Sequence, residues 1–112
     1  MILKALPYIL LGLIIQLFEV FAQEVELSQR EKDSLILVEL YNSTNGDNWW
    51  NNTNWLSGPI DTWYGVLYGT YGDNFEGIFL AGNNLSGPIP PEIGDIYIIE
   101  SGSLLLNNNN LT

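Results

Sequence analysis

The feature that most constrains the fold is an internal repeat. Residues 78–90 read Ile-Phe-Leu-Ala-Gly-Asn-Asn-Leu-Ser-Gly-Pro-Ile-Pro, and residues 104–112 repeat the first part of this pattern 26 positions later. A self-similar period of this length is typical of a solenoid, in which each unit buries its apolar face only by stacking on its neighbours. We therefore predict an α/β fold that begins a stacked solenoid.

The spacing within the repeat has a physical reason. The first and third residues of the pattern belong to a short strand, so their side chains face the interior together. Asn83 and Asn109 are expected to turn inward where each strand ends. Their carboxamides would form a structural asparagine ladder that binds otherwise unpaired backbone groups and supports the next coil. The two prolines that follow would hold an extended segment with Ile89 inward.

These residues resemble the plant-type leucine-rich repeat, whose strands read LxxLxLxxN and whose opposite side reads LxGxIPxxIGxL; residues 92–96 continue the match. Residues 33–41, 44–49, 54–56 and 63–66 resemble the helical, Trp-rich N-terminal cap of the same family. Plant members flank the last of these segments with cysteines. This chain has no cysteine, which points to the bacterial-type versions. The resemblance covers nearly all of the chain after the leader and implies a non-catalytic binding scaffold.

The predicted layout has a leader, a cap and repeats. Residues 1–22 are expected to be a signal peptide, residues 23–74 the N-terminal cap, and residues 75–112 about one and a half leucine-rich repeats. The repeats are expected to be truncated, with further repeats after Thr112, since solenoids usually need about three or more stacked units. Residues 97–102 depart from plain leucine spacing and are expected to distort their coil.

Within the cap, a helix is predicted over about residues 28–43. Ser28 and Glu31 fit a capping box, in which each residue's side chain satisfies a backbone amide of the other. Glu31, Asp33 and Glu39 are expected to face water. The face predicted to be buried carries Ile36, Leu37, Leu40 and Tyr41.

Three segments are predicted to follow this helix in the cap. The first is a Trp-rich turn, and the second is a strand over about residues 63–68. A hairpin turn over residues 69–74 would then lead to a strand at residues 75–80.

The leader has the layout of a secretory signal. Lys4 supplies the positive end, an apolar run covers residues 5–18, and Val20-Phe21-Ala22 suits cleavage after Ala22. A membrane anchor is the alternative. A spanning helix needs about 20 apolar residues, and Glu19 shortens this run. We expect a secreted or cell-surface protein that contacts a membrane only through an uncleaved signal.

The charge of the chain excludes one class of partner. The net charge is −10, and after the leader only Arg30 and Lys32 are cationic. Nucleic-acid binding needs a basic surface that neutralises phosphates. No nucleic acid is therefore expected as a partner, and the ligand is expected to be a protein or another cell-surface molecule.

Catalysis, metals and cofactors are not expected. Without His or Cys, no serine or threonine hydroxyl has an imidazole to activate it, and the usual zinc and redox sites are absent. Asp73 and Glu76 are a carboxylate pair of a kind that glycosidases use. Asp47 and Asp73 are oxygen ligands that suit calcium. We interpret both sets of residues more simply as carboxylates in turns that face water.

The predicted binding surface is the outer, concave face of the sheet, where solenoids usually hold their ligands. Its outward positions in one coil are Gly77, Phe79 and Ala81, and in the next Ser103, Leu105 and Asn107. Phe79 and Leu105 would be apolar, exposed and side by side. Such a patch suits a protein more than a polar glycan.

The tryptophans suggest an alternative function. Trp49, Trp50, Trp55 and Trp63 could stack on sugars as a carbohydrate-binding surface. Core packing of the cap is favoured, although the adjacent pair cannot both point inward from an extended segment. Four N-x-[ST] sequons, at Asn42, Asn51, Asn84 and Asn110, matter only in a host that glycosylates exported proteins.

Overall fold

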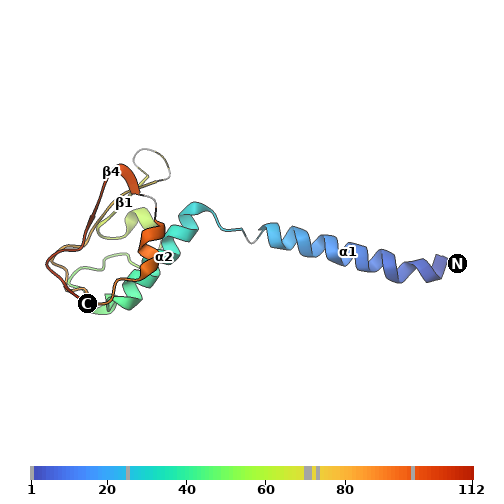
Figure 1. The fold of residues 1–112 in the computed structure, drawn as a ribbon, viewed down its shortest axis with the longest axis horizontal. Helices are drawn as coiled ribbons and strands as arrows, with labels where there is room; N and C mark the ends of the chain where they lie inside the picture. The colour runs from blue at the N-terminus through green and yellow to red at the C-terminus, as the bar shows by residue number, and fades with distance from the viewer. Residues whose placement is uncertain (1, 25, 70–71, 73, 97) are drawn as a thin grey trace.

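The chain combines helices and strands. The computed structural model describes residues 2–24, 26–69, 72, 74–96 and 98–112 (Figure 1). In chain order the elements are α1 (Ile2–Glu24), α2 (Gln29–Ser43), η1 (Gly46–Asn48), η2 (Ile60–Thr62), β1 (Val66–Tyr68), β2 (Phe75–Phe79), β3 (Ser86–Gly87), η3 (Pro91–Asp95), β4 (Ile98–Leu105) and β5 (Asn110–Leu111).

Helix α1 contains nearly all of the predicted signal sequence and projects away from the rest of the chain (Figure 1). Its large apolar side chains from Tyr8 to Phe18 are 48–78% exposed, so the remainder of the fold does not cover them. No helix in the described part of the chain is long and apolar enough to cross a membrane.

The helix predicted over about residues 28–43 is present as α2, and its predicted capping box is formed. The Ser28 side chain accepts from the Glu31 amide, and Glu31 Oε2 accepts from the Ser28 amide at 2.8 Å. This hydrogen bond is the main reason that the pKa of Glu31 lies below its usual value. Leu37, Leu40 and Tyr41 are buried as expected.

The expectation that Asp33 faces water was wrong. Its side chain is buried, because residues 33, 37 and 40 follow the helical period and share one face. Gln29 Nε2 donates to Asp33 Oδ1 at 2.8 Å. Burial raises the pKa of Asp33, and the hydrogen bond from Gln29 offsets part of that rise.

We expect Asp33→Asn to stabilise the fold at neutral pH. The raised pKa means that the folded state binds a proton more tightly than the unfolded state, so the penalty for a buried carboxylate grows as pH rises through the folded pKa. The variant keeps an acceptor for Gln29 and has no such penalty. Urea unfolding of the original protein and the variant at pH 3.5 and pH 7 measures the difference in their free energies of unfolding. A stability difference that does not change with pH would contradict this interpretation.

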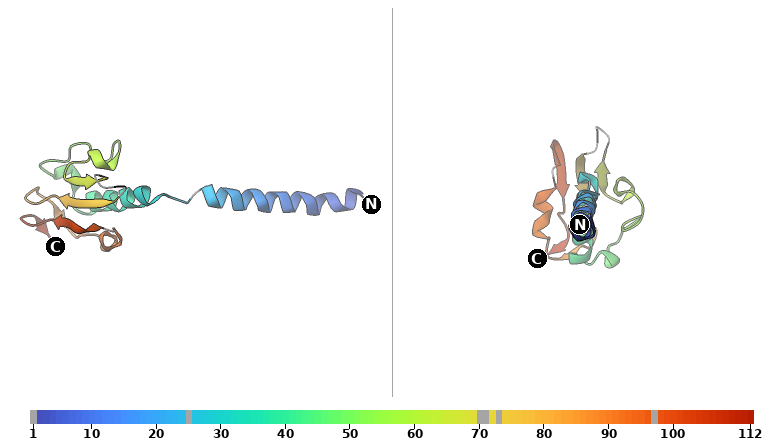
Figure 2. Two further views of the ribbon diagram at one scale, coloured as in Figure 1. Left: turned by 90° about the horizontal axis from the view of Figure 1, so that it is seen from above. Right: turned by 90° about the vertical axis from the view of Figure 1, so that its right-hand side faces the viewer.

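The main sheet has three strands in the order β1-β2-β4, which Figure 2 shows side by side. β1 and β2 form the predicted antiparallel hairpin, although residues 70, 71 and 73 of its turn lie outside the described part. β1 is shorter than the predicted strand 63–68. The Trp63 amide closes the turn of η2 on Ile60, and Gly65 takes a left-handed backbone (φ +80°), so extended structure starts only at Val66.

β2 and β4 pair in parallel, with Ile78 opposite Leu104 and Phe79 opposite Leu105. This register equals the 26-residue displacement of the repeat. The pairing is irregular at its start, because Phe75 is opposite Ile98 whereas Gly77 is already opposite Ser103. The extra residues of β4 belong to the segment 97–102 that departs from leucine spacing; Tyr97 itself lies outside the described part.

The core lies between α2, the Trp-rich turn and the inner face of the sheet. Phe75, Ile78, Leu80 and Leu85 are fully buried. Ile89 was predicted to point inward, and this was wrong, since its side chain is 38% exposed. Alternate residues of an extended segment face opposite sides, and here Pro90 takes the buried side.

Candidate functional site

The outer face of the sheet carries the apolar positions predicted from the sequence. Phe79 is 39% exposed on β2, and Leu105 is 43% exposed directly opposite it on β4. Directly opposed residues of neighbouring strands point to the same face. The two side chains therefore form one continuous apolar surface across the parallel pair.

A third residue, which the sequence analysis missed, extends this surface onto β1. Leu67 is 44% exposed and lies opposite Gly77. Gly77, a predicted outward position, lies on the same side as Phe79 but is not itself exposed. It is buried because the ring of Phe79 folds back over its Cα, in the space that a Cβ would need. The ring thus lies on the same face as Leu67, and we call Leu67, Phe79 and Leu105 the outer-face patch.

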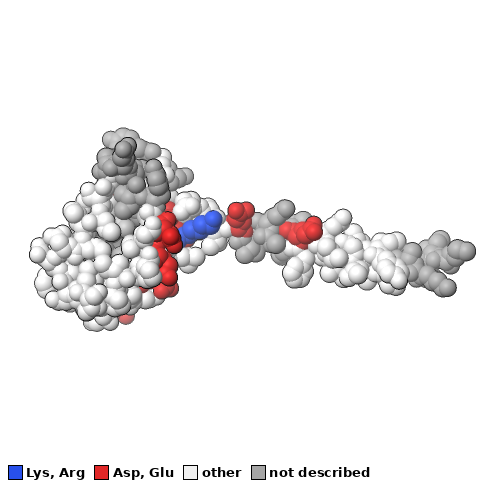
Figure 3. Space-filling view, viewed as in Figure 1, with Lys and Arg blue, Asp and Glu red and all other residues white. Residues whose placement is uncertain are grey.

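The remaining predicted positions lie around this patch. Ala81 and Asn107 are exposed beyond the ends of β2 and β4, and Ser103 is half-buried in β4. None of the six positions carries a charge. In the view of Figure 3, carboxylates form a band beside basic side chains near the start of α2. The patch can therefore bind mainly through apolar contact.

Two asparagines join the coils below this face. Asn109 Oδ1 accepts from the amides of Asn83 and Leu85 at 2.9 and 3.0 Å, and its Nδ2 donates to the Leu80 carbonyl at 2.8 Å. Each of these partners lies 24–29 residues earlier, in the preceding copy of the sequence repeat. Each asparagine was predicted to support the repeat that follows it. In the structure the Asn109 side chain instead binds backbone groups of the repeat that precedes it.

Asn83 makes the equivalent contact with the Trp-rich turn. Its Oδ1 accepts from the Asn51 amide and its Nδ2 donates to the Asn51 carbonyl, both at 2.8 Å. The Trp50 amide donates to the Asn83 carbonyl at 3.2 Å. The turn therefore contacts Asn83 much as residues 80–85 contact Asn109, although its sequence has no repeat pattern.

Three of the four tryptophans belong to the core. Trp49, Trp55 and Trp63 are buried, with ring centroids 4.8 Å apart for the first pair and 5.0 Å for the second. Their indole nitrogens donate to the carbonyls of Thr44, Tyr64 and Ser57. Trp50, in contrast, is 77% exposed. Of the four indoles, this one alone is largely exposed to solvent.

The other candidate residues have separate surroundings where the structure describes them. Asp47 Oδ1 accepts from the Tyr41 hydroxyl at 2.6 Å, which is the main reason that the pKa of Tyr41 is raised. Glu76 is buried in β2, and its proposed partner Asp73 lies outside the described residues. Within the described residues no three His, Cys, Asp or Glu side chains are grouped to hold a metal.

The sequons differ in their surroundings. Asn42 and Asn110 are exposed, whereas Asn51 and Asn84 are half-buried. The side chain of Asn51 accepts from the Thr53 amide at 3.1 Å, and that of Asn84 donates to the Asn48 carbonyl at 2.9 Å. The exposed pair is therefore the more accessible to a modifying enzyme.

Comparison of the chain with protein-family models, with curated proteins and with solved structures gives no match in any of the three.

Proposed function

We propose that this chain begins a leucine-rich-repeat solenoid that serves as a non-catalytic scaffold for protein recognition outside the cell. Two observations support the architecture. The parallel register of β2 and β4 equals the period of the repeat. Asn83 and Asn109 bind the preceding coil through equivalent carboxamide contacts. The predicted signal supports a secreted or cell-surface location, with membrane attachment through an uncleaved signal as the alternative.

The outer-face patch carries the proposal for the binding site. Three neighbouring strands each expose a large apolar side chain there, with no described charge between them. Fully burying one such side chain is worth about 1.5–3 kcal/mol. Stable interfaces concentrate their binding energy in a few central anchors of this kind. A protein ligand that covers the outer-face patch would therefore gain enough binding free energy to be held specifically.

Photo-crosslinking tests this site. A photoreactive amino acid at Leu67, and separately at Leu105, should capture the same partner from the secreted and surface proteins of the source organism. Leu105→Asp should abolish capture from position 67, because it places a charge in the apolar contact.

The matched control carries the photoreactive group at Leu35, which is 55% exposed on α2, away from the sheet. Different partners from positions 67 and 105, or the same partner from position 35, would contradict the proposed site.

Carbohydrate binding is the second candidate, because Trp50 exposes its ring to solvent. Exposed indoles are suited to stacking on the apolar face of a sugar. A glycan array separates the two functions. Binding that Trp50→Ala removes and Leu105→Asp leaves unchanged would favour the carbohydrate module.

A further inference from the structure

A second surface with a different character lies between α2 and the loop over residues 56–63, and it shares no lining residue with the outer-face patch. A groove of about 550 Å³ separates α2 from the loop over residues 56–63. Ligand sites generally occupy about 300–1,000 Å³. Val38 of α2 and Ile60 and Trp63 of the loop line the groove, and Leu56 and Pro59 also contribute apolar surface. The groove has room for an apolar side chain of a partner.

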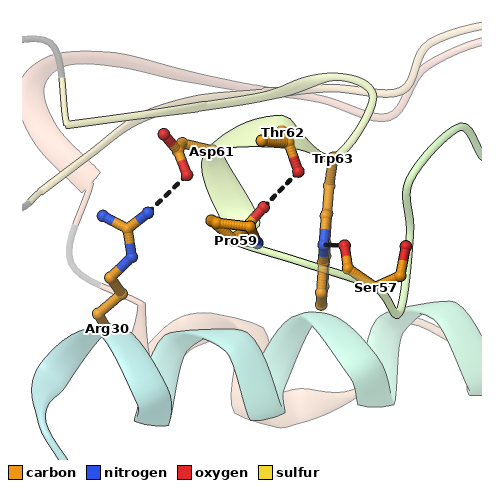
Figure 4. Close-up of polar contacts among 6 residues, drawn as sticks. All are labelled: Arg30, Ser57, Pro59, Asp61, Thr62 and Trp63. Carbon is orange, nitrogen blue, oxygen red and sulfur yellow. Dashed lines mark hydrogen bonds and ion pairs between the residues drawn. The ribbon is translucent and has the colours of Figure 1, made fainter.

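One end of the groove is charged, as Figure 4 shows. Arg30 Nη2 donates to Asp61 Oδ1 at 2.6 Å, and the Arg30 guanidinium lies 4.8 Å from the centre of the Tyr68 ring. Glu31 also lines the groove. Asp61 does not line the groove itself, but it lies beside Arg30, which does, so Glu31, Arg30 and the adjacent Asp61 together carry one negative charge in excess. This local excess has the same sign as the net charge of the whole chain, which is −10.

The rim of the groove is held in an unusual backbone conformation. Leu56 has a φ of +67° and is 49% exposed. A left-handed backbone is unfavourable for a residue other than glycine. The indoles on either side hold this turn. Trp55 Nε1 donates to the Tyr64 carbonyl, and Trp63 Nε1 donates to the Ser57 carbonyl, as Figure 4 shows. Such strain is found mainly where the surrounding structure holds a residue for a function.

We propose that this groove binds a basic segment of a partner protein, with one apolar side chain inserted between α2 and the loop and flanking cations beside Glu31 and Asp61. The apolar walls select the inserted side chain. The acidic chain attracts cations over long range and repels an acidic segment. The site is separate from the outer-face patch and does not depend on the function proposed for it.

Short peptides serve as probes for nuclear magnetic resonance on the isotope-labelled full chain. The basic probe is acetyl-Lys-Lys-Phe-Lys-Lys-amide, and the two controls replace its lysines by glutamate or its phenylalanine by serine. We expect saturable shifts of the Trp63 indole N–H and of the Arg30 and Val38 amides with the basic probe. The acidic and serine probes should bind about tenfold more weakly or not at all.

Two variants separate binding from folding. Leu56→Gly removes the rim side chain while glycine readily accepts the positive φ, so the fold should persist and the basic probe should bind about tenfold more weakly. Asp61→Asn removes one carboxylate beside Arg30 and should reduce the preference for the basic over the acidic probe. Leu35→Ala, on α2 but outside the groove lining, should leave binding unchanged.

Equal binding of the basic and acidic probes would overturn the proposal. So would unchanged binding by Leu56→Gly, shifts confined to α1, or no saturable shift. Loss of the outer-face cross-link would leave these measurements unaffected, so the two proposals can fail separately.

Discussion

Replacing Trp55 by alanine is expected to destabilise the fold by about 3–5 kcal/mol, the usual cost of removing a large buried aromatic side chain. Trp55 is 7% exposed and lies between Trp49 and Trp63, with its ring also stacked 5.9 Å from Tyr41. The substitution opens a cavity among these rings. It also removes the hydrogen bond of 2.9 Å from Nε1 to the Tyr64 carbonyl.

Urea unfolding followed by far-ultraviolet circular dichroism measures this loss, and Trp50→Ala is its matched control. Trp50 belongs to the same turn but is 77% exposed, so its replacement should change the free energy of unfolding by no more than about 0.5 kcal/mol. Equal losses for the two variants would show that the buried cluster does not stabilise the cap.

Replacing Asn83 by alanine is expected to destabilise the fold by about 2–5 kcal/mol. Its carboxamide pairs both the amide and the carbonyl of Asn51, and its side chain is only 4% exposed. Alanine leaves both backbone groups without this partner. An unpaired buried group costs about 1–3 kcal/mol, and because Asn51 is only half-buried, the two groups together fall below the upper end of twice that range. The Trp-rich turn would then lose its main attachment to the first repeat.

Hydrogen exchange together with urea unfolding tests this expectation, since exchange should increase most at the Asn51 amide. Asn107→Ala is the control, because Asn107 is exposed on the outer side of the same region and its substitution should change stability by no more than about 0.5 kcal/mol. Asn83→Asp keeps an acceptor for the Asn51 amide but opposes a carboxylate to the Asn51 carbonyl. It should therefore be less stable at neutral pH than at acid pH. Asn51 protection unchanged by Asn83→Ala would rule out this attachment.

Features set by local chemistry could be predicted from the sequence. The capping box of Ser28 and Glu31 depends on residues three positions apart, so the start of α2 was predictable without its neighbours. The pairing of Phe79 with Leu105 follows from self-similarity, because identical patterns stack with their own period. Both outward-facing residues of the patch on β2 and β4 were therefore predicted.

Other features required the packed structure. Leu67 became part of the patch only through the antiparallel register that places it opposite Gly77. The apolar residues around Leu67 gave no sign of which one would face outward, because alternation assigns a face only after the register is known. The groove was also missed, since its two walls come from α2 and from a loop with no periodic pattern.

The sequence by itself therefore determined the elements whose cause is local or periodic: the capped helix α2, the strands of the repeat and the inward asparagines. Only the tertiary structure decided which partners these elements meet. Asp33 is buried because its helix face packs inward, although its side chain is charged. Asn83 binds a turn more than 30 residues earlier, and the ring of Phe79 covers Gly77. Contacts of this kind depend on how chain segments distant in sequence close against one another, and short-range propensity carries no information about that closure.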